Sequence, residues 1–296
     1  MLFLVNPNAG QRRVNKFLTE ILGIFNEGGY EVTVFLTAGP GSGARIVETR
    51  ATQYDLVVCA GGDGTLNETI TGVLRAGADC PIGYIPCGST NDFASTLKLS
   101  TDVVQAAKDI MLGRAEEYDV GRWGDRYFSY IASFGAFTRV SYATPQNLKN
   151  TLGHLAYVLS GITELPQIRS IPMSLELDGE KVEGTYLIGA IANSTSVGGV
   201  ITLDPKYVDM SDGLLEILLV RVPRNLAELA ECLQAFQTQN YNNCAMVTFR
   251  SVSRLTVHQN PSLVWTLDGE RAEGQAEIHI ENLHRAIRLI RNREVL

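Results

Sequence analysis

The first third of the chain alternates short apolar runs with helical periods, and this alternation limits the folds that the chain can adopt. Four runs, "LFLVN", "EVTVFLT", "DLVVCA" and "IGYIP", are bounded by turn formers and predict strands. Between the first two, apolar residues from Val14 to Phe25 recur at helical spacing and stop before Gly28 and Gly29. This order predicts an α/β domain with a doubly wound parallel sheet, which binds ligands at the carboxyl ends of its strands.

The sequence pattern changes after about residue 118, where predicted strands follow one another with turn signals between them. "MSLELDGEKVEGTYLIGAIAN" carries a hairpin signal at Asp178-Gly179, and "SLVWTLDGERAEGQAEIHIEN" repeats the pattern later. One helical segment, "NLAELAECLQAFQTQ", interrupts the strands. We therefore expect an α/β domain at 1–118 and a mostly antiparallel β domain at 119–283, with residues 284–296 as candidates to return to the first domain.

Composition and charge limit the binding partners, the cellular location and the site chemistry that we expect for the protein. The chain has 25 Lys and Arg against 32 Asp and Glu, a net charge of −7, which disfavours a nucleic-acid surface. The start, "MLFLVNPNAG", lacks a basic leader, and no apolar stretch is long enough to span a bilayer, so we expect a cytoplasmic protein. Five cysteines without C-x-x-C spacing predict reduced structural thiols, and four scattered histidines disfavour zinc and Ser/His/Asp chemistry.

Three glycine-containing loops follow predicted strands. In "GGDGT", bare backbone lets phosphate oxygens approach N–H groups, and the helix that follows adds partial positive charge. Asp63 would sit beside those anions only with Mg²⁺ or a donor hydroxyl between them. The alternative is a tight turn with a capping aspartate. "NPNAG" and "PCGSTNDFA" end other strands at the same expected edge, which favours one convergent site. Neither a P-loop nor a Rossmann glycine motif is present.

Five motifs, "NPNAG", "GGDGTLNE", "GSTNDFA", "SDGLLE" and "LDGE", occur in an order and at separations that resemble the soluble diacylglycerol kinase and sphingosine kinase superfamily, most closely its bacterial lipid kinases. The resemblance covers nearly the whole chain. It implies an N-terminal nucleotide-binding α/β domain, a C-terminal antiparallel β-sandwich, and an active site in the cleft between them where ATP meets a lipid. It also implies ATP and Mg²⁺ as the cofactors.

The resemblance further implies a set of nucleotide contacts. They are Asn6, Pro7, Asn8, Ala9, Gly10, Thr37, Gly61, Gly62, Asp63, Gly64, Thr65, Leu66, Asn67, Ser89, Thr90, Asn91 and Asp92. The family usually has threonine where Ser89 stands, and many members have arginine where this chain has Ser95. The nearest cation is Lys98, so the second departure bears on phosphate affinity.

In "VDMSDGLLE" the resemblance implies a structural Mg²⁺ held by the Asp212 carboxylate and by main-chain carbonyls near Asp209 and Leu214, with Asp119 linking the metal to the active site. A bare Asp-Gly hairpin is the alternative. The resemblance gives Glu270 of the late "LDGE" the role of general base, with Asp268 as the alternative base and Asp63 orienting metal or hydroxyl. The earlier copy of "DGE", at 178–180, is interpreted as a turn.

The sequence thus predicts a lipid kinase that moves the γ-phosphoryl group of ATP to a lipid hydroxyl, diacylglycerol-like or sphingoid. A NAD kinase and a non-enzymatic nucleotide- or lipid-binding relative are the alternatives. The membrane lipid substrate implies peripheral membrane contact. The sequence is compatible with either a monomer or a homodimer. In "HRAIRLIRNREVL", the arginines at 285, 288, 291 and 293 fit either a solvated final strand or attraction to anionic headgroups.

Overall fold

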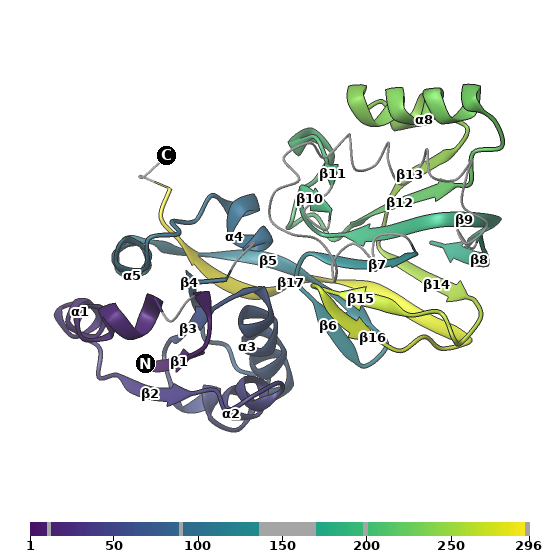
Figure 1. The fold of residues 1–296 in the computed structure, drawn as a ribbon. Coiled ribbons are helices and arrows are strands. Elements are labelled where there is room, and N and C mark those ends of the chain that lie inside the picture. The colour runs from purple at the N-terminus through teal and green to yellow at the C-terminus, as the bar shows by residue number, and fades with distance from the viewer. Residues whose placement is uncertain (11–12, 89–90, 136–169, 198–200, 294–296) are drawn as a thin grey trace. The chain divides into compact units, whose positions relative to one another are not determined.

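The structure is a computed structural model of the 296-residue chain, and it describes residues 1–10, 13–88, 91–135, 170–197 and 201–293 (Figure 1). The chain forms two compact units. The first contains residues 1–120 and the residues from 284 onward, and the second contains residues 121–283.

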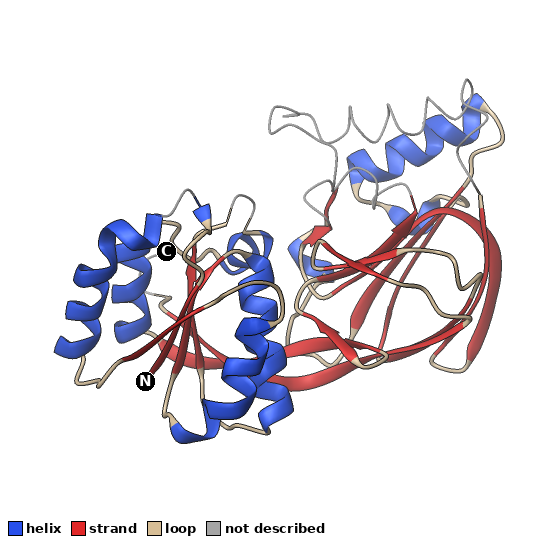
Figure 2. Cartoon of the chain, turned by 60° about the horizontal axis from the view of Figure 1, so that its bottom comes forward, coloured by secondary structure: helices blue, strands red, loops and turns tan. Residues whose placement is uncertain are grey.

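The first unit is built on parallel strands in the order β4-β3-β1-β2. These strands are β1 (Leu2–Val5), β2 (Thr33–Leu36), β3 (Val57–Gly61) and β4 (Ile82–Pro86). The helices are α1 (Arg13–Glu27), α2 (Ser42–Arg50), α3 (Asp63–Ala76), α4 (Asp92–Leu97) and α5 (Val103–Leu112), with a 3₁₀ turn at Ala51–Gln53. Figure 2 shows helices on both faces of these strands. The predicted parallel α/β fold is confirmed.

Helix α1 shows how the sequence pattern becomes packing. Its buried residues, Val14, Ile21 and Phe25, lie on one face and join the core of the unit. The Phe25 ring meets Phe3 of β1 edge-on, with ring centroids 5.4 Å apart. Beyond the helix, Gly29 adopts a left-handed conformation with φ 85°, and the chain turns toward β2.

The boundary between the two units falls within two long strands, β5 (Arg114–Trp123) and β17 (Glu277–Arg291). Within the first unit, Leu289 of β17 pairs in parallel with Ile82 of β4. The C-terminal strand therefore extends the sheet of the first unit beside β4.

The second unit is a set of antiparallel strands. They are β6 (Arg126–Phe128), β7 (Ile131–Gly135), β8 (Ile171–Leu177), β9 (Glu180–Ala192), β12 (Leu215–Arg221), β13 (Val247–Val252), β14 (Arg254–His258), β15 (Trp265–Leu267) and β16 (Glu270–Ala272). The main path is β16-β15-β7-β9-β8-β14-β17, and β12 pairs with β9 and β13. The described part of this unit also contains a short strand pair, β10 (Ser196–Val197) and β11 (Ile201–Thr202), helix α8 (Leu226–Thr238), and 3₁₀ turns at Pro205–Tyr207 and Tyr241–Asn243. Among its core residues, Trp265 stacks obliquely on Phe134 with centroids 4.8 Å apart.

Two Asp-Gly turns connect neighbouring strands of the second unit. Asp178 and Gly179 have φ of 46° and 93°, and Asp268 and Gly269 have φ of 49° and 83°. Positive φ at both central residues is the signature of the tight hairpin that Asp-Gly favours. The hairpin predicted at 178–179 is confirmed, because Leu177 and Glu180 pair across it.

All five cysteines are buried free thiols. Burial raises the pKa of Cys59, Cys87 and Cys232 to about 12, so these three thiols stay protonated at neutral pH. Among the described residues, no helix has the length and apolar character needed to cross a membrane.

Candidate functional site

Three glycine-containing loops leave the carboxyl ends of β1, β3 and β4. Main-chain hydrogen bonds between the strands continue to the points where these loops begin. The Asn6 N–H donates to the Ala60 carbonyl at 2.9 Å, and the Cys87 N–H donates to the Gly61 carbonyl at 2.7 Å. Thr37 begins a fourth loop at the same edge, with its N–H on the Val5 carbonyl at 2.9 Å. Helix α3 starts directly after Gly62, and the edge therefore carries a helix N-terminus beside these loops.

The "NPNAG" loop touches both of its neighbours. Asn6 Nδ2 donates to Thr65 Oγ1 of "GGDGT" at 3.2 Å, and Asn6 Oδ1 accepts the Asn8 N–H at 3.1 Å. At the far end of the loop, Gly10 has φ 52°, and a Cβ built there would overlap the carbonyl oxygen of Cys87. Only glycine permits that approach, so the first loop is fixed against the third.

The second and third loops meet through two glycines. A Cβ built on Gly62 would come 3.2 Å from the Cα of Gly88, and one built on Gly88 would come 2.7 Å from the Cα of Gly62. Asn91 closes the third loop, since its side chain accepts the Gly88 N–H at 2.8 Å and donates to the Gly88 carbonyl at 3.1 Å. The predicted contacts Ser89 and Thr90 lie outside the described residues. The remaining parts of the three loops form one connected surface.

Asp63 links α3 to α4. Its side chain is 8% exposed, and its two carboxylate oxygens face the N–H groups of Asp92 at 3.3 Å and Phe93 at 3.4 Å. A carboxylate at the first N–H groups of a helix is electrostatically favourable. The Asp63 carboxylate therefore holds the start of α4 against the "GGDGT" loop. Lys98, the cation nearest in sequence to Ser95, caps the C-terminal end of α4.

Glu68 is a residue that the sequence reasoning missed. From the second turn of α3 its Oε1 accepts the Gly41 N–H at 2.6 Å and its Oε2 accepts the Gly43 N–H at 2.7 Å. Gly43 has no room for a side chain, because a Cβ there would come 2.6 Å from Glu68 Oε2. Glu68 thus anchors the loop that begins at Thr37. The signal was present in the sequence as an acid directly after "GGDGTLN" and a glycine-rich loop at 39–43.

Asp268, one of the two candidate bases, is enclosed in the second unit. It is 4% exposed, and its carboxylate accepts the Ser129 N–H at 2.6 Å, the Ser129 hydroxyl at 2.8 Å, and the N–H groups of Tyr130 and Ile131 at 3.0 Å each. Burial raises the pKa of Asp268, and these four donors oppose that rise. Three of the four donors are main-chain N–H groups of residues 129–131. The Asp268 carboxylate therefore fixes the β15–β16 turn to that segment.

Glu270, the other candidate base, has an exposed side chain. The fraction exposed is 52%, and Oε2 lies 3.7 Å from Arg126 Nη2 of β6. The two carboxylates of "LDGE" therefore differ in exposure: Asp268 is enclosed, and the Glu270 side chain is about half exposed to solvent.

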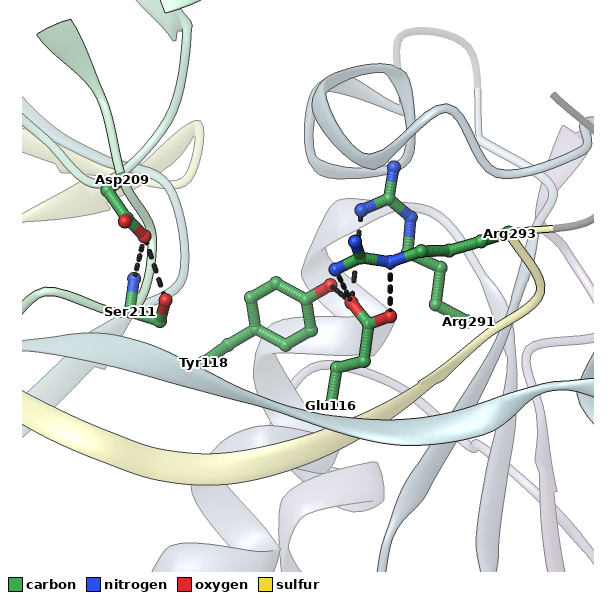
Figure 3. Close-up of polar contacts among 6 residues, drawn as sticks. All are labelled: Glu116, Tyr118, Asp209, Ser211, Arg291 and Arg293. Atoms are coloured by element: carbon green, nitrogen blue, oxygen red, sulfur yellow. Dashed lines mark hydrogen bonds and ion pairs between the residues drawn. The ribbon is translucent and has the colours of Figure 1, made fainter. Parts of the chain in front are cut away.

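The predicted metal donors lie in the turn before β12. Asp209 Oδ1 accepts the N–H and hydroxyl of Ser211, at 3.0 and 2.8 Å (Figure 3). Asp212 Oδ1 accepts the Leu214 N–H at 2.9 Å. The Leu214 carbonyl accepts from Asn282 Nδ2 at 2.7 Å. In the part of the chain that the structure describes, no three His, Cys, Asp or Glu side chains are grouped as for a metal. The donors are all oxygen atoms, a set that fits Mg²⁺ bound by few carboxylates, carbonyls and water.

Asp119 lies on β5 in the first unit and is 1% exposed. Its Oδ1 accepts the Arg285 N–H from β17 at 2.7 Å. The hydrogen bond joins two strands that are far apart in the sequence.

The C-terminal arginines are paired with acidic side chains. Arg293 binds Glu116 through two nitrogens at 2.5 and 2.9 Å, and Arg291 lies 3.9 Å from the same carboxylate (Figure 3). The Arg293 hydrogen bond lowers the pKa of Glu116, while burial and then Glu116 raise the pKa of Tyr118 to about 12. Arg288 pairs with Asp79 at 2.8 Å and Arg285 with Glu117 at 3.5 Å. Three carboxylates from other parts of the chain therefore face these four arginines.

Two family models match the chain. Residues 1–123 match the diacylglycerol kinase catalytic domain, and residues 131–291 match the YegS C-terminal NAD kinase beta sandwich-like domain. A diacylglycerol kinase of Bacillus subtilis is 31% identical over 293 residues, covering 98% of this chain and 96% of the relative. One from Staphylococcus carnosus is 30% identical over 294 residues, covering 99% and 95%.

Solved structures share the fold along the whole chain. A crystal structure of a diacylglycerol kinase from Bacillus anthracis superposes with a TM-score of 0.75 at 22% identity, covering 100% of this chain and 97% of that one. The predicted combination of an N-terminal α/β domain and a C-terminal β-sandwich is confirmed. The chain belongs to the diacylglycerol kinase family of lipid kinases, enzymes that transfer phosphate to an alcohol.

Proposed function

We propose that the protein transfers the γ-phosphoryl group of ATP to the hydroxyl of a diacylglycerol-like lipid. The contact of the three glycine loops beside the N-terminus of α3 is the observation that carries the ATP half of the proposal. Relatives called diacylglycerol kinase over nearly the full length support the lipid half.

In the proposed reaction the glycine loops hold the phosphates through main-chain N–H groups, and Glu270 accepts the proton of the lipid hydroxyl. Asp63 and Glu68 act on loop geometry, since each holds main-chain N–H groups of a neighbouring loop or helix. Mg²⁺, when bound, supplies positive charge that offsets the phosphate charge. Phosphoryl transfer depends mainly on positioning and electrostatics, so rigid loops are an advantage.

A side-by-side assay with labelled ATP tests the substrate. The acceptors are diacylglycerol, sphingosine, other lipid alcohols and NAD, and the products are separated by organic extraction. We expect label in the organic phase with diacylglycerol. Label in NADP alone would overturn the lipid proposal and favour the NAD kinase alternative, and label with sphingosine alone would move the substrate class to sphingoid lipids.

Replacing Gly62 with valine is expected to weaken ATP binding at least about tenfold. The new side chain would meet the Gly88 backbone 3.2 Å from its Cβ and would cover main chain that approaches phosphate. Binding of ATP is measured by calorimetry on folded protein. Gly23→Val, in α1 with no atom within 4 Å of the added Cβ, is the control and keeps wild-type affinity. Unchanged affinity in Gly62→Val would place the phosphates elsewhere.

We further propose a structural Mg²⁺ held by the Asp212 carboxylate and by main-chain carbonyls near Asp209 and Leu214. Mg²⁺ should then raise the melting temperature of the wild type, because a ligand of the folded state adds about 2.7 kcal/mol at 100 times its Kd. Asp212→Ala should lose this response and some turnover. Asp204→Ala, which removes another exposed turn carboxylate, should keep it. An equal response in Asp212→Ala would make the loop a plain turn.

Membrane contact is proposed as peripheral and reversible, because the lipid substrate lies in a bilayer.

A further inference from the structure

Two arginines of the first unit share one carboxylate. Arg293 donates to the two oxygens of Glu116, at 2.5 and 2.9 Å, and Arg291 Nη1 lies 3.9 Å from Glu116 Oε2. The Tyr118 hydroxyl donates to the same Oε2 at 2.9 Å. Figure 3 shows both guanidinium groups gathered at this carboxylate. Among the described residues, no second carboxylate pairs with either arginine, so the group carries one positive charge in excess.

The other two arginines of the same segment are paired one to one. Arg285 lies 3.5 Å from the Glu117 carboxylate. Arg288 lies 2.8 Å from the Asp79 carboxylate and also donates to the Asp79 carbonyl at 2.6 Å. Counted over these ion pairs, the excess positive charge of the segment therefore lies at Glu116.

This excess charge lies in a partly enclosed place. The side chains of Arg291 and Glu116 are 16% and 22% exposed. Charges interact more strongly where water is partly excluded, so two neighbouring guanidinium groups repel each other more there than on an open surface. An anion bound between them would remove this repulsion.

The hydrogen-bond donors of Arg291 point to the same conclusion. A guanidinium has five N–H donors. Within the described part of the chain, Arg291 contacts the Tyr118 hydroxyl and, at 3.9 Å, the Glu116 carboxylate, which is beyond hydrogen-bond distance. Most of its donors are therefore left for a ligand or for water. A phosphate group has several acceptor oxygens and matches the fork of a guanidinium, so it meets the need for both charge and acceptors.

The direction of β17 also relates these arginines to phosphate chemistry. Leu289 of β17 pairs in parallel with Ile82 of β4, and β4 ends at Pro86, where the third glycine loop begins. Parallel strands end at the same edge of a sheet. The C-terminal end of β17, which carries Arg291, therefore leads toward the edge from which the glycine loops leave.

We propose that Arg291 and Arg293 bind a phosphate group at the C-terminal end of β17, supplied by ATP or by an anionic lipid headgroup. Glu116 and Tyr118 position the two guanidinium groups. The inference goes beyond the proposed reaction, and it is tested by binding alone, so its failure would leave the proposed roles of the glycine loops and Glu270 standing.

The test compares Arg291→Gln and Arg293→Gln with the wild type in two binding measurements. ATP binding is measured by calorimetry, and membrane binding by flotation with phosphatidylcholine vesicles that contain or lack phosphatidic acid. We expect at least one of the two affinities to fall about tenfold in each variant, the effect of losing a charge-assisted hydrogen bond. A loss for ATP assigns the site to the nucleotide, a loss for phosphatidic acid vesicles assigns it to lipid headgroups, and losses in both show that it accepts either source.

Arg288→Gln is the matched control, because it removes an arginine of the same strand that has a carboxylate of its own, and it should keep both affinities. Arg293 is 68% exposed, so Arg293→Gln should fold even if Arg291→Gln does not, and thermal melting checks this. Unchanged affinities in Arg293→Gln would overturn the inference, whatever its melting temperature, because the arginines would then only tether the strand to β5. Equal losses in Arg288→Gln would also overturn it, since the net charge of the segment would then be sufficient.

Discussion

Replacing Glu270 with glutamine is expected to lower turnover by about 100-fold to 10,000-fold, the usual loss when a general base is removed. Glutamine keeps the size of the side chain and can form hydrogen bonds, but it accepts no proton at neutral pH. Glu270 is exposed and lies in the unit that does not contain the three glycine loops, so ATP affinity should change little. Steady-state phosphorylation of diacylglycerol and ATP binding by calorimetry together measure both effects.

The matched control is Glu180→Gln, at the same position of the other Asp-Gly-Glu turn. It loses its hydrogen bond with Arg250, yet it should keep wild-type turnover. Equal losses in the two variants would show that the effect comes from the turn structure and would contradict the assignment of Glu270 as the base.

Replacing Asp268 with asparagine is expected to destabilise the protein by at least about 3 kcal/mol, as for breaking a buried, hydrogen-bonded charge. The carboxylate of Asp268 accepts four donors, whereas an asparagine amide has one acceptor oxygen and would turn its NH₂ toward N–H groups. Chemical denaturation of the full chain measures the change in the free energy of unfolding.

Asp178→Asn is the control for that loss, because the equivalent carboxylate is exposed and water can replace its partners. Its stability should fall by less. A folded Asp268→Asn variant with wild-type stability and no turnover would make Asp268 the base in place of Glu270.

Much of the fold was predictable because it depends on local signals. Strands β1, β3 and β4 were predicted as apolar runs between turn formers, and parallel strands end at one edge, so their loops were expected to converge. The turn at Asp178-Gly179 was predictable because Asp-Gly at the centre of a hairpin favours two positive φ values.

The roles of single carboxylates were harder to predict, because their partners are distant in the sequence. Glu68 binds Gly41 and Gly43 across 27 and 25 positions, and Asp268 binds Ser129 across 139. Nothing in the local pattern marks Asp268 as enclosed and Glu270 as exposed two residues later. The acidic partners of the C-terminal arginines could not be predicted for the same reason, because Glu116 and Asp79 lie far before them in the chain.

The burial of all five cysteines makes the native chain a ready background for site-directed labelling. Maleimide dyes react with exposed thiolates, and a thiol with a pKa of about 12, such as Cys59 or Cys232, forms almost none at neutral pH. A cysteine introduced at Leu112 of the first unit or Leu226 of the second, where the side chains are 73% and 72% exposed, would therefore be the preferred point of attachment. Fluorophores at these two positions could follow the enzyme through its cycle without first replacing any natural cysteine.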